Sequence, residues 1–225
     1  MTPAQPLGLA ADRSRTRTIA WAAVAALAAS LTAVALARTV ARSEPPPVLA
    51  ELPAFSLLDK SGDPLTAADM RGRIWVADFV FTTCAGACPT MTARMARLQR
   101  KLPDDVWMVS FTVDPAHDTP EVLTRYAQRA GAGPRWLFVT GKPEAVYALA
   151  VRGFKLAVEA VPPERQTQGE GPFLHSSHFV LVDAGGRVRG YYDSTDERAL
   201  GGLVRDVAAL RANAAPGPDL SRDRP

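Results

Sequence analysis

Two cysteines and three histidines are the side chains of this sequence best suited to metal binding and redox chemistry. The cysteines, Cys84 and Cys88, lie four residues apart directly after a long apolar run, and the sequence contains no other cysteine. Thiolates attack disulfides and bind soft metal ions. The pair can therefore serve as a redox-active dithiol or as two ligands of Cu(I) or zinc.

The surroundings of the two cysteines predict reactive thiols. A strand is expected at residues 74–81, and Pro89 suits the first turn of a helix, so a helix should begin near Cys88. The partial positive charge at a helix N-terminus favours thiolate over thiol. We therefore expect both sulfurs to have enhanced thiolate character.

The four-residue spacing favours a metal over a plain structural disulfide. Within a helix such a pair has Cβ atoms about 5–6 Å apart, whereas an unstrained disulfide needs roughly 3.5–4.5 Å, which only a loop conformation at Cys84 would allow. Two metal–sulfur bonds of roughly 2.3 Å each bridge the wider gap. A disulfide that closes so short a loop would also contribute little stability.

Three histidines, His117, His175 and His178, are available to complete a metal site. His175 and His178 are three residues apart just before a predicted strand, so in an extended chain they point to opposite faces and only one can face the cysteines. For His178 we favour an ordinary strand-edge residue with a satisfied hydrogen bond. His117 lies in a loop rich in Pro and Asp and is expected at the surface.

The elements that must position these residues alternate between strands and helices. Apolar runs predict strands at 74–81, 106–113, 136–139 and 179–182, and Gly185-Gly186 predicts a hairpin into 188–192. Helical patterns occupy about 89–101, 120–130, 142–150 and 195–212. This order predicts an α/β fold with a central mixed sheet flanked by helices.

The N-terminal segment predicts a membrane anchor. Residues 18–37 contain no charged side chain and are long enough to cross a hydrocarbon core of roughly 30 Å as a helix. Three arginines precede this stretch and favour a cytoplasmic location for residues 1–17. Ala-Leu-Ala at 35–37 leaves a cleaved signal peptide as the alternative. In both cases the remainder of the chain is exported.

Beyond the anchor, composition divides the chain into three parts. Residues 38–49 include three successive prolines and predict a stiff linker, residues 50–213 form the folded domain, and residues 214–225 are expected to be disordered. Residues 1–42 carry a local charge of +4, so the rest of the chain contributes about −1 to the formal net charge of +3. No broad basic surface for nucleic acid is therefore expected.

Three motifs resemble the signatures of the Sco/SenC family. They are FTTCAGACPTM at 81–91, TVDPAHDTP at 112–120 and HSSHFVLVD at 175–183, in this order. The resemblance implies a thioredoxin-like fold preceded by one transmembrane helix. It also implies a copper site formed by both cysteines of CxxxCP and the histidine six residues before Leu181, which is His175. Ala85 and Leu174 replace residues common in the family, and these departures could alter metal affinity or redox potential.

The same resemblance implies a copper metallochaperone that delivers copper to, or matures, the binuclear copper centre of cytochrome c oxidase. The cargo would be Cu(I), with Cu(II) left open. Implied partners are the copper-bearing oxidase subunit or another copper protein, the membrane through the N-terminal helix, and a thiol reductant. The implied location is a bacterial-type inner membrane, as a single-pass protein with its domain in the periplasm. Such a protein is not an enzyme in the strict sense.

The main alternative is a membrane-anchored thiol–disulfide oxidoreductase that acts on exported proteins. Cys84 and Cys88 would then be the redox-active pair, and His175 would tune the thiolate. A peroxidase with one attacking and one resolving cysteine has no further supporting feature, and a copper-responsive regulator would need the same ligands as a chaperone.

Four neighbouring residues have two interpretations each. Asp114 and Asp118 are expected either to support the cysteine loop or to make turn and helix-cap hydrogen bonds. Met91 and Met95 have helical spacing, which favours core packing over thioether ligation of copper.

Overall fold

The computed structural model describes residues 12–41, 44–156, 159–160, 173–174 and 176–213. The chain divides into two units, Met1–Glu44 and Pro45–Pro225. The first contains α1 (Asp12–Ala41), which includes the predicted anchor at 18–37. Within the described residues, no helix combines the length and the apolar character that a membrane span requires.

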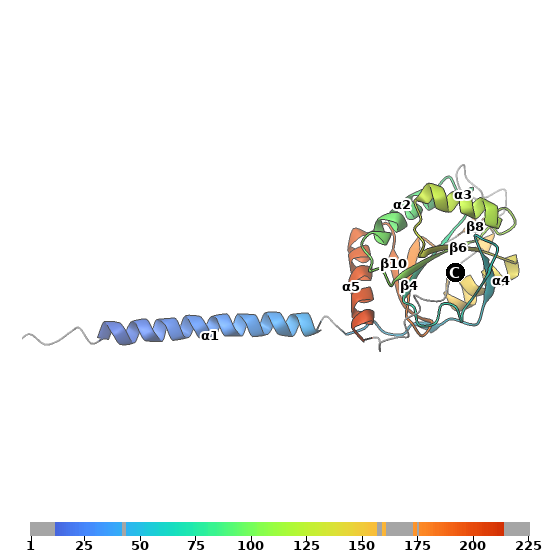
Figure 1. Cartoon of the computed structure of the whole chain (residues 1–225). Coiled ribbons are helices and arrows are strands. Elements are labelled where there is room, and N and C mark those ends of the chain that lie inside the picture. Colours follow the sequence, from blue (N-terminus) through green and yellow to red (C-terminus); the bar gives the residue numbers. More distant parts are fainter. Residues whose placement is uncertain (1–11, 42–43, 157–158, 161–172, 175, 214–225) are drawn as a thin grey trace, which may run out of the picture. The chain divides into compact units, whose positions relative to one another are not determined.

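A mixed eight-stranded sheet forms the centre of the second unit (Figure 1). Three strands in its middle are parallel, and the remaining neighbours pair antiparallel. In spatial order the strands are β1 (Ala50–Glu51), β10 (Arg187–Asp193), β9 (His178–Val182), β4 (Trp75–Val80), β5 (Trp107–Thr112), β6 (Trp136–Thr140), β2 (Ser56–Asp59) and β3 (Pro64–Thr66). All six residues of β4 are buried, as expected of a strand covered on both faces.

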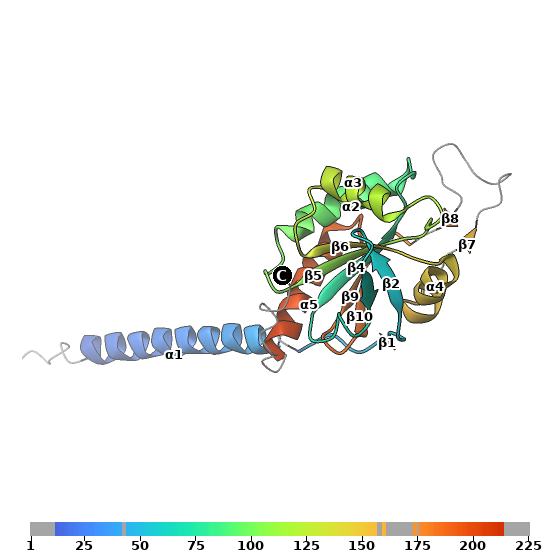
Figure 2. The same ribbon diagram turned by 45° about the vertical axis from the view of Figure 1, so that its right-hand side comes forward.

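Helices cover both faces of this sheet (Figure 2). The apolar sides of α2 (Ala87–Gln99), α3 (Pro120–Ala130) and α5 (Glu197–Asn213) pack on one face. On the other face, α4 (Pro143–Ala148) and the π-helix η1 (Leu149–Gly153) pack on a cluster of aromatic residues. A separate pair of short strands, β7 (Glu159–Ala160) and β8 (Phe173–Leu174), lies outside the main sheet.

Local sequence explains the limits of α3. Thr119 is its N-cap and accepts a hydrogen bond from the backbone N–H of Val122, and Pro120 occupies the first turn, where a missing N–H costs nothing. Gly131 ends the helix in the left-handed conformation, with φ of 67°. These three residues therefore fix where the helix begins and where it ends.

The predicted α/β architecture with a central mixed sheet is confirmed, with one correction among the helices. The helix expected at 142–150 is α-helical only to Ala148 and continues as a π-helix, because Phe154 N–H bonds to the carbonyl of Leu149, five residues back. The short strands β1, β2 and β3 were not predicted. The predicted tail at 214–225 lies outside the described residues.

Candidate metal centre

The two cysteines lie where β4 passes into α2. Cys84 belongs to the loop after the strand, and its N–H bonds to the carbonyl of Phe81 at 3.3 Å. Cys88 is the second residue of α2. Cys84 is 8% exposed and Cys88 is fully buried, and neither forms a disulfide.

The two thiols are close enough to act together. Their side chains share a hydrogen bond, so the two sulfur atoms lie close together. A single metal ion can bridge two sulfurs at such a separation with two metal–sulfur bonds. Burial raises the pKa of Cys88, and the neighbouring Cys84 and Asp78 raise it further, although a hydrogen bond from the Phe81 backbone lowers it. The expectation of thiolate character from the helix N-terminus is therefore wrong for Cys88, because desolvation outweighs the helix dipole.

Asp118 fastens the cysteine loop to the sheet. Its buried carboxylate accepts hydrogen bonds from Thr82 N–H at 3.1 Å, from Thr82 Oγ1 at 2.5 Å and from Thr112 Oγ1 at 2.5 Å. Thr82 follows β4, whereas Thr112 ends β5. Of the two interpretations of Asp118, support of the cysteine loop is confirmed, since the cap of α3 is Thr119. Burial and the charge of Asp118 raise the pKa of Asp114.

The described histidines occupy different places. His117 Nδ1 lies 3.1 Å from Asp118 Oδ1, and its side chain is 52% exposed, as expected of a surface residue. His178 begins β9, and its Nδ1 lies 2.9 Å from Ser176 Oγ, so the expected satisfied strand-edge residue is confirmed. His175 lies outside the described residues.

Strand register relates the histidine segment to the cysteine loop. β9 runs antiparallel to β4, with Trp75 opposite Val182 and Ala77 opposite Val180. The amino-terminal end of β9 therefore lies beside the carboxyl-terminal end of β4, where the cysteine loop begins. The backbone of Ser177 is held there by a 3.0 Å bond from Ser194 N–H.

A buried aspartate beneath α2 escaped the sequence analysis. Asp78 of β4 is completely buried, accepts a 2.5 Å hydrogen bond from Ser110 Oγ, and leaves Oδ2 without a partner. Trp136 Nε1 donates in turn to Ser110 Oγ at 2.9 Å. Burial raises the Asp78 pKa to about 7. The available signal was a single carboxylate inside the apolar run IWVADFVF.

Other candidate residues have packing roles. Met91 and Met95 are buried among apolar side chains of the α2 face, so the favoured interpretation as core residues is confirmed. Phe81 is buried in the same cluster as both cysteines. Among the described residues, no three His, Cys, Asp or Glu side chains are grouped as a metal site would require.

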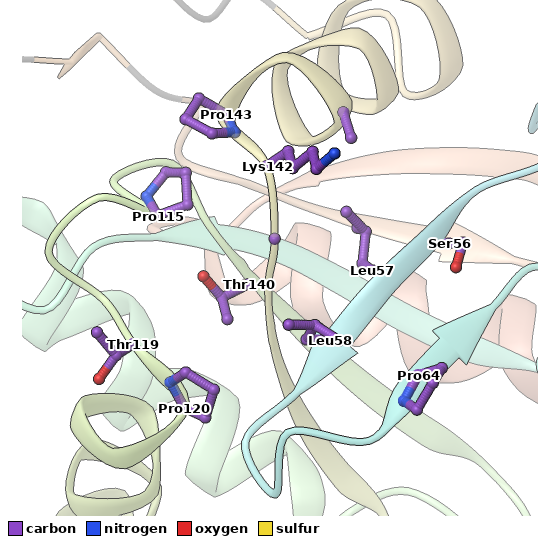
Figure 3. Close-up of a pocket in the computed structure, with 12 residues that line it drawn as sticks. Ser56, Leu57, Leu58, Pro64, Pro115, Thr119, Pro120, Thr140, Lys142 and Pro143 are labelled. Carbon is purple, nitrogen blue, oxygen red and sulfur yellow. The ribbon is translucent and has the colours of Figure 1, made fainter.

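A cavity of about 720 Å³ lies away from the cysteines, between β2, the start of α3 and the start of α4 (Figure 3). Leu57, Leu58 and several prolines line it, and Lys142 is the charged residue on its rim. None of the described residues lining it is a cysteine, histidine or carboxylate. The cavity therefore offers no metal ligands, and the thiol pair is the candidate centre.

Comparison with known proteins shows which sequences and solved structures this chain resembles. A sequence model of the family described as SCO1/SenC matches residues 44–209. A SCO1 protein homolog from Bacillus subtilis is 32% identical over 72% of this chain and 83% of its own length. A candidate copper-binding protein from Stutzerimonas stutzeri is 31% identical over 62% of this chain and 68% of its own. A solved structure of BsSco is 30% identical, with a TM-score of 0.66 over 76% of this chain and 99% of that one. BsSco is described as having a disulfide switch and as a member of the Sco family of cytochrome c oxidase assembly proteins.

Proposed function

The chain belongs to the SCO1/SenC family, and from this premise we propose that it is a copper metallochaperone that delivers copper to, or matures, the binuclear copper centre of cytochrome c oxidase. The observation that carries the proposal is the pair of buried thiols at the start of α2, which are not joined by a disulfide and share a hydrogen bond. The copper-binding description of the S. stutzeri relative and the oxidase-assembly description of BsSco support it.

In this proposal Cys84 and Cys88 hold Cu(I) as cargo. Thiolate sulfur is a soft ligand that suits Cu(I), and a buried site keeps water away from the ion. Since burial raises the pKa of Cys88, copper must displace its proton, and affinity should increase with pH. Cys84, which is slightly exposed, is the sulfur that a recipient's ligand can reach first during exchange.

We assign the third ligand to His175. The strand register supports this choice, because the segment that leads into β9 lies beside the end of β4. His178 is less suitable, since its Nδ1 already lies at hydrogen-bond distance from Ser176 Oγ. An imidazole together with two thiolates is a donor set that suits Cu(I).

Membrane anchoring is part of the same proposal. Residues 18–37 would form a single span within α1, with residues 1–17 cytoplasmic and the copper domain on the periplasmic side of a bacterial-type inner membrane. The absence of charge over this stretch and the arginines before it support the assignment. Membrane fractionation with protease protection tests it: an exported domain is digested only after the outer barrier is opened.

A thiol–disulfide oxidoreductase is the second candidate. It is favoured by one observation, the two reduced thiols within hydrogen-bond distance of each other, and by the disulfide switch described for BsSco. Cys84 would attack a disulfide of an exported protein, and Cys88 would then close the intramolecular disulfide, which a separate thiol reductant must reduce. Both activities use the same sulfurs, and oxidation would prevent copper binding.

Copper titration separates the two candidates. The reduced full-length chain in detergent is titrated with Cu(I) under anaerobic conditions, beside Cys84→Ser, Cys88→Ser, His175→Ala and His178→Ala. We expect one copper per chain, and losses in the first three variants that exceed the roughly 10–100-fold cost of losing an outer-shell partner. If copper binding ignores His175 while the dithiol reduces a model disulfide, the oxidoreductase is the function.

A further inference from the structure

A small groove is lined by the second half of α2 and the first half of α5, which pack on the same face of the sheet (Figure 1). Its volume is about 220 Å³, and its apolar part is formed by Leu98, Leu200 and Val204. A space of this size accepts one side chain of a partner, whereas a flat surface would not select any.

Cations surround this groove. Arg94, Arg97 and Lys101 line it from the α2 side, and α2 contains no acidic residue. The Arg205 guanidinium approaches it from α5, near Gly201. Glu197 is the one carboxylate among the described lining residues, and it lies 3.7 Å from Arg94. Because the chain beyond residue 42 has a net charge of about −1, this positive region is local.

Two glycines lie in the middle of α5, and one of them borders the groove. Gly201 lines it, and Gly202 follows. A Cβ at Gly201 would meet only Arg205 Nη1 at 3.5 Å, and one at Gly202 would meet nothing closer than 3.7 Å. Alanine therefore fits at both positions and is the better helix former. Packing alone does not require glycine at either position, and at Gly201 the missing side chain leaves open space in the groove.

The groove is connected to both parts of the candidate metal centre. Arg94 stands on the same helix as Cys88, and its Nη1 donates to the carbonyl of Ser194 at 2.6 Å. Ser194 N–H in turn holds the carbonyl of Ser177, in the segment between His175 and β9. A partner that contacts Arg94 therefore touches the scaffold of the cysteines and of the histidine segment together.

We propose that this groove docks the protein that exchanges copper or thiols with the metal centre, by receiving an apolar side chain surrounded by Asp and Glu residues on the partner's surface. The inference rests on the proposed function, since it names the chemistry of the partner of that same site. An acidic protein fits better than an anionic lipid surface, because the cations converge on one concave space with an apolar floor.

Charge reversal tests the docking site directly. Binding of the purified copper-centre domain of the oxidase is measured for the full-length chain in detergent, both copper-free and Cu(I)-loaded, at low and high salt. In Arg97→Glu/Lys101→Glu we expect association to slow about 10-fold at low salt and its salt dependence to weaken. Arg125→Glu/Arg129→Glu is the matched control, because it reverses the charge of two exposed arginines on α3. Arg129 lies in the last turn of α3, just as Arg97 lies in the last turn of α2.

The outcomes are distinct. Association within twofold of the wild type, an equal loss in the α3 control, or no binding by the wild type overturns the docking site. So does a loss of binding to phosphatidylglycerol vesicles with unchanged binding of the oxidase domain, which would make the groove a lipid site. Because the copper-free chain is also measured, a failure of the Cu(I) titration rejects the copper role without deciding the docking result.

Discussion

The two ends of α2 have opposite characters. At its beginning, Cys88, Met91 and Met95 are buried, and a carboxylate with an unpartnered oxygen lies in the strand beneath. At its end, Arg97 and, just beyond the helix, Lys101 are exposed and line an open groove. Thiols that hold a metal need protection from water and oxidants, whereas a recognition surface needs exposed charge. One helix can serve both needs because it carries a buried thiol near its beginning and exposed cations near its end.

The largest effect is expected at the buried end, from the aspartate that holds the cysteine loop. Asp118→Ala leaves the donors of Thr82 and Thr112 without an acceptor, so we expect the free energy of unfolding to fall by about 3–5 kcal/mol and Cu(I) affinity to fall with it. Urea denaturation and copper titration measure the two losses.

Asp114→Ala is the control for that experiment. The backbone of Asp114 contributes to the 112–120 loop, and its carboxylate bonds to the backbone of His117. Within the described part of the chain, this carboxylate makes no hydrogen bond to the cysteine segment, and burial opposes its charge. We expect a loss below about 1 kcal/mol. Equal losses in the two variants would show that the loop does not depend on the Asp118 carboxylate.

A pH-dependent effect is expected from Asp78. Well below the ordinary pKa of 3.8, the Asp78 carboxyl is protonated in both the folded and the unfolded chain. As the pH rises toward the folded pKa of about 7, the unfolded chain loses its proton and the folded chain retains it, so the free energy of unfolding falls by up to roughly 4 kcal/mol. Asp78→Asn cannot ionise, and its stability relative to the wild type should therefore increase over this range in urea denaturation series.

Ser110→Ala sharpens the Asp78 test. The hydrogen bond from Ser110 lowers the pKa of Asp78, so its removal should extend the stability loss to higher pH while leaving the carboxylate in place. Parallel pH profiles for the wild type and Asp78→Asn would mean that Asp78 keeps its ordinary pKa in the folded chain.

A smaller effect is expected from Met95, which tests whether the buried end holds metal through sulfur other than that of cysteine. Met95→Leu preserves volume, so the stability loss should stay below about 1.5 kcal/mol. Copper stoichiometry and transfer rate should not change, because Met95 packs in the core. Slower transfer at unchanged stability would assign the thioether a role in passing copper on.

Local sequence patterns predicted most of the helices and strands, whereas contacts between distant segments determine the properties of the buried groups at the site. The limits of α3 follow from Thr119, Pro120 and Gly131, which act on their own neighbours. The raised pKa of Cys88 depends on burial by segments distant in sequence. Asp78 is tolerated because Ser110, from another strand, satisfies one of its oxygens. Neither fact can be deduced from spacing.

The groove at the exposed end of α2 gives the smallest expected change in stability and the most discriminating test, through a glycine of α5 that lines it. Gly201→Ala places a methyl group in the groove, in ordinary contact with Arg205, and removes a mid-helix glycine, so we expect stability to rise by about 0.5–1 kcal/mol while the oxidase domain associates more slowly. Gly202→Ala should give a similar gain in stability without slower association, since Gly202 does not line the groove. If both variants gain stability and neither changes association, the open space at Gly201 is not used by the partner. A gain in stability paired with slower association at Gly201 alone would show that α5 is kept less stable than its fold allows because the partner needs that space.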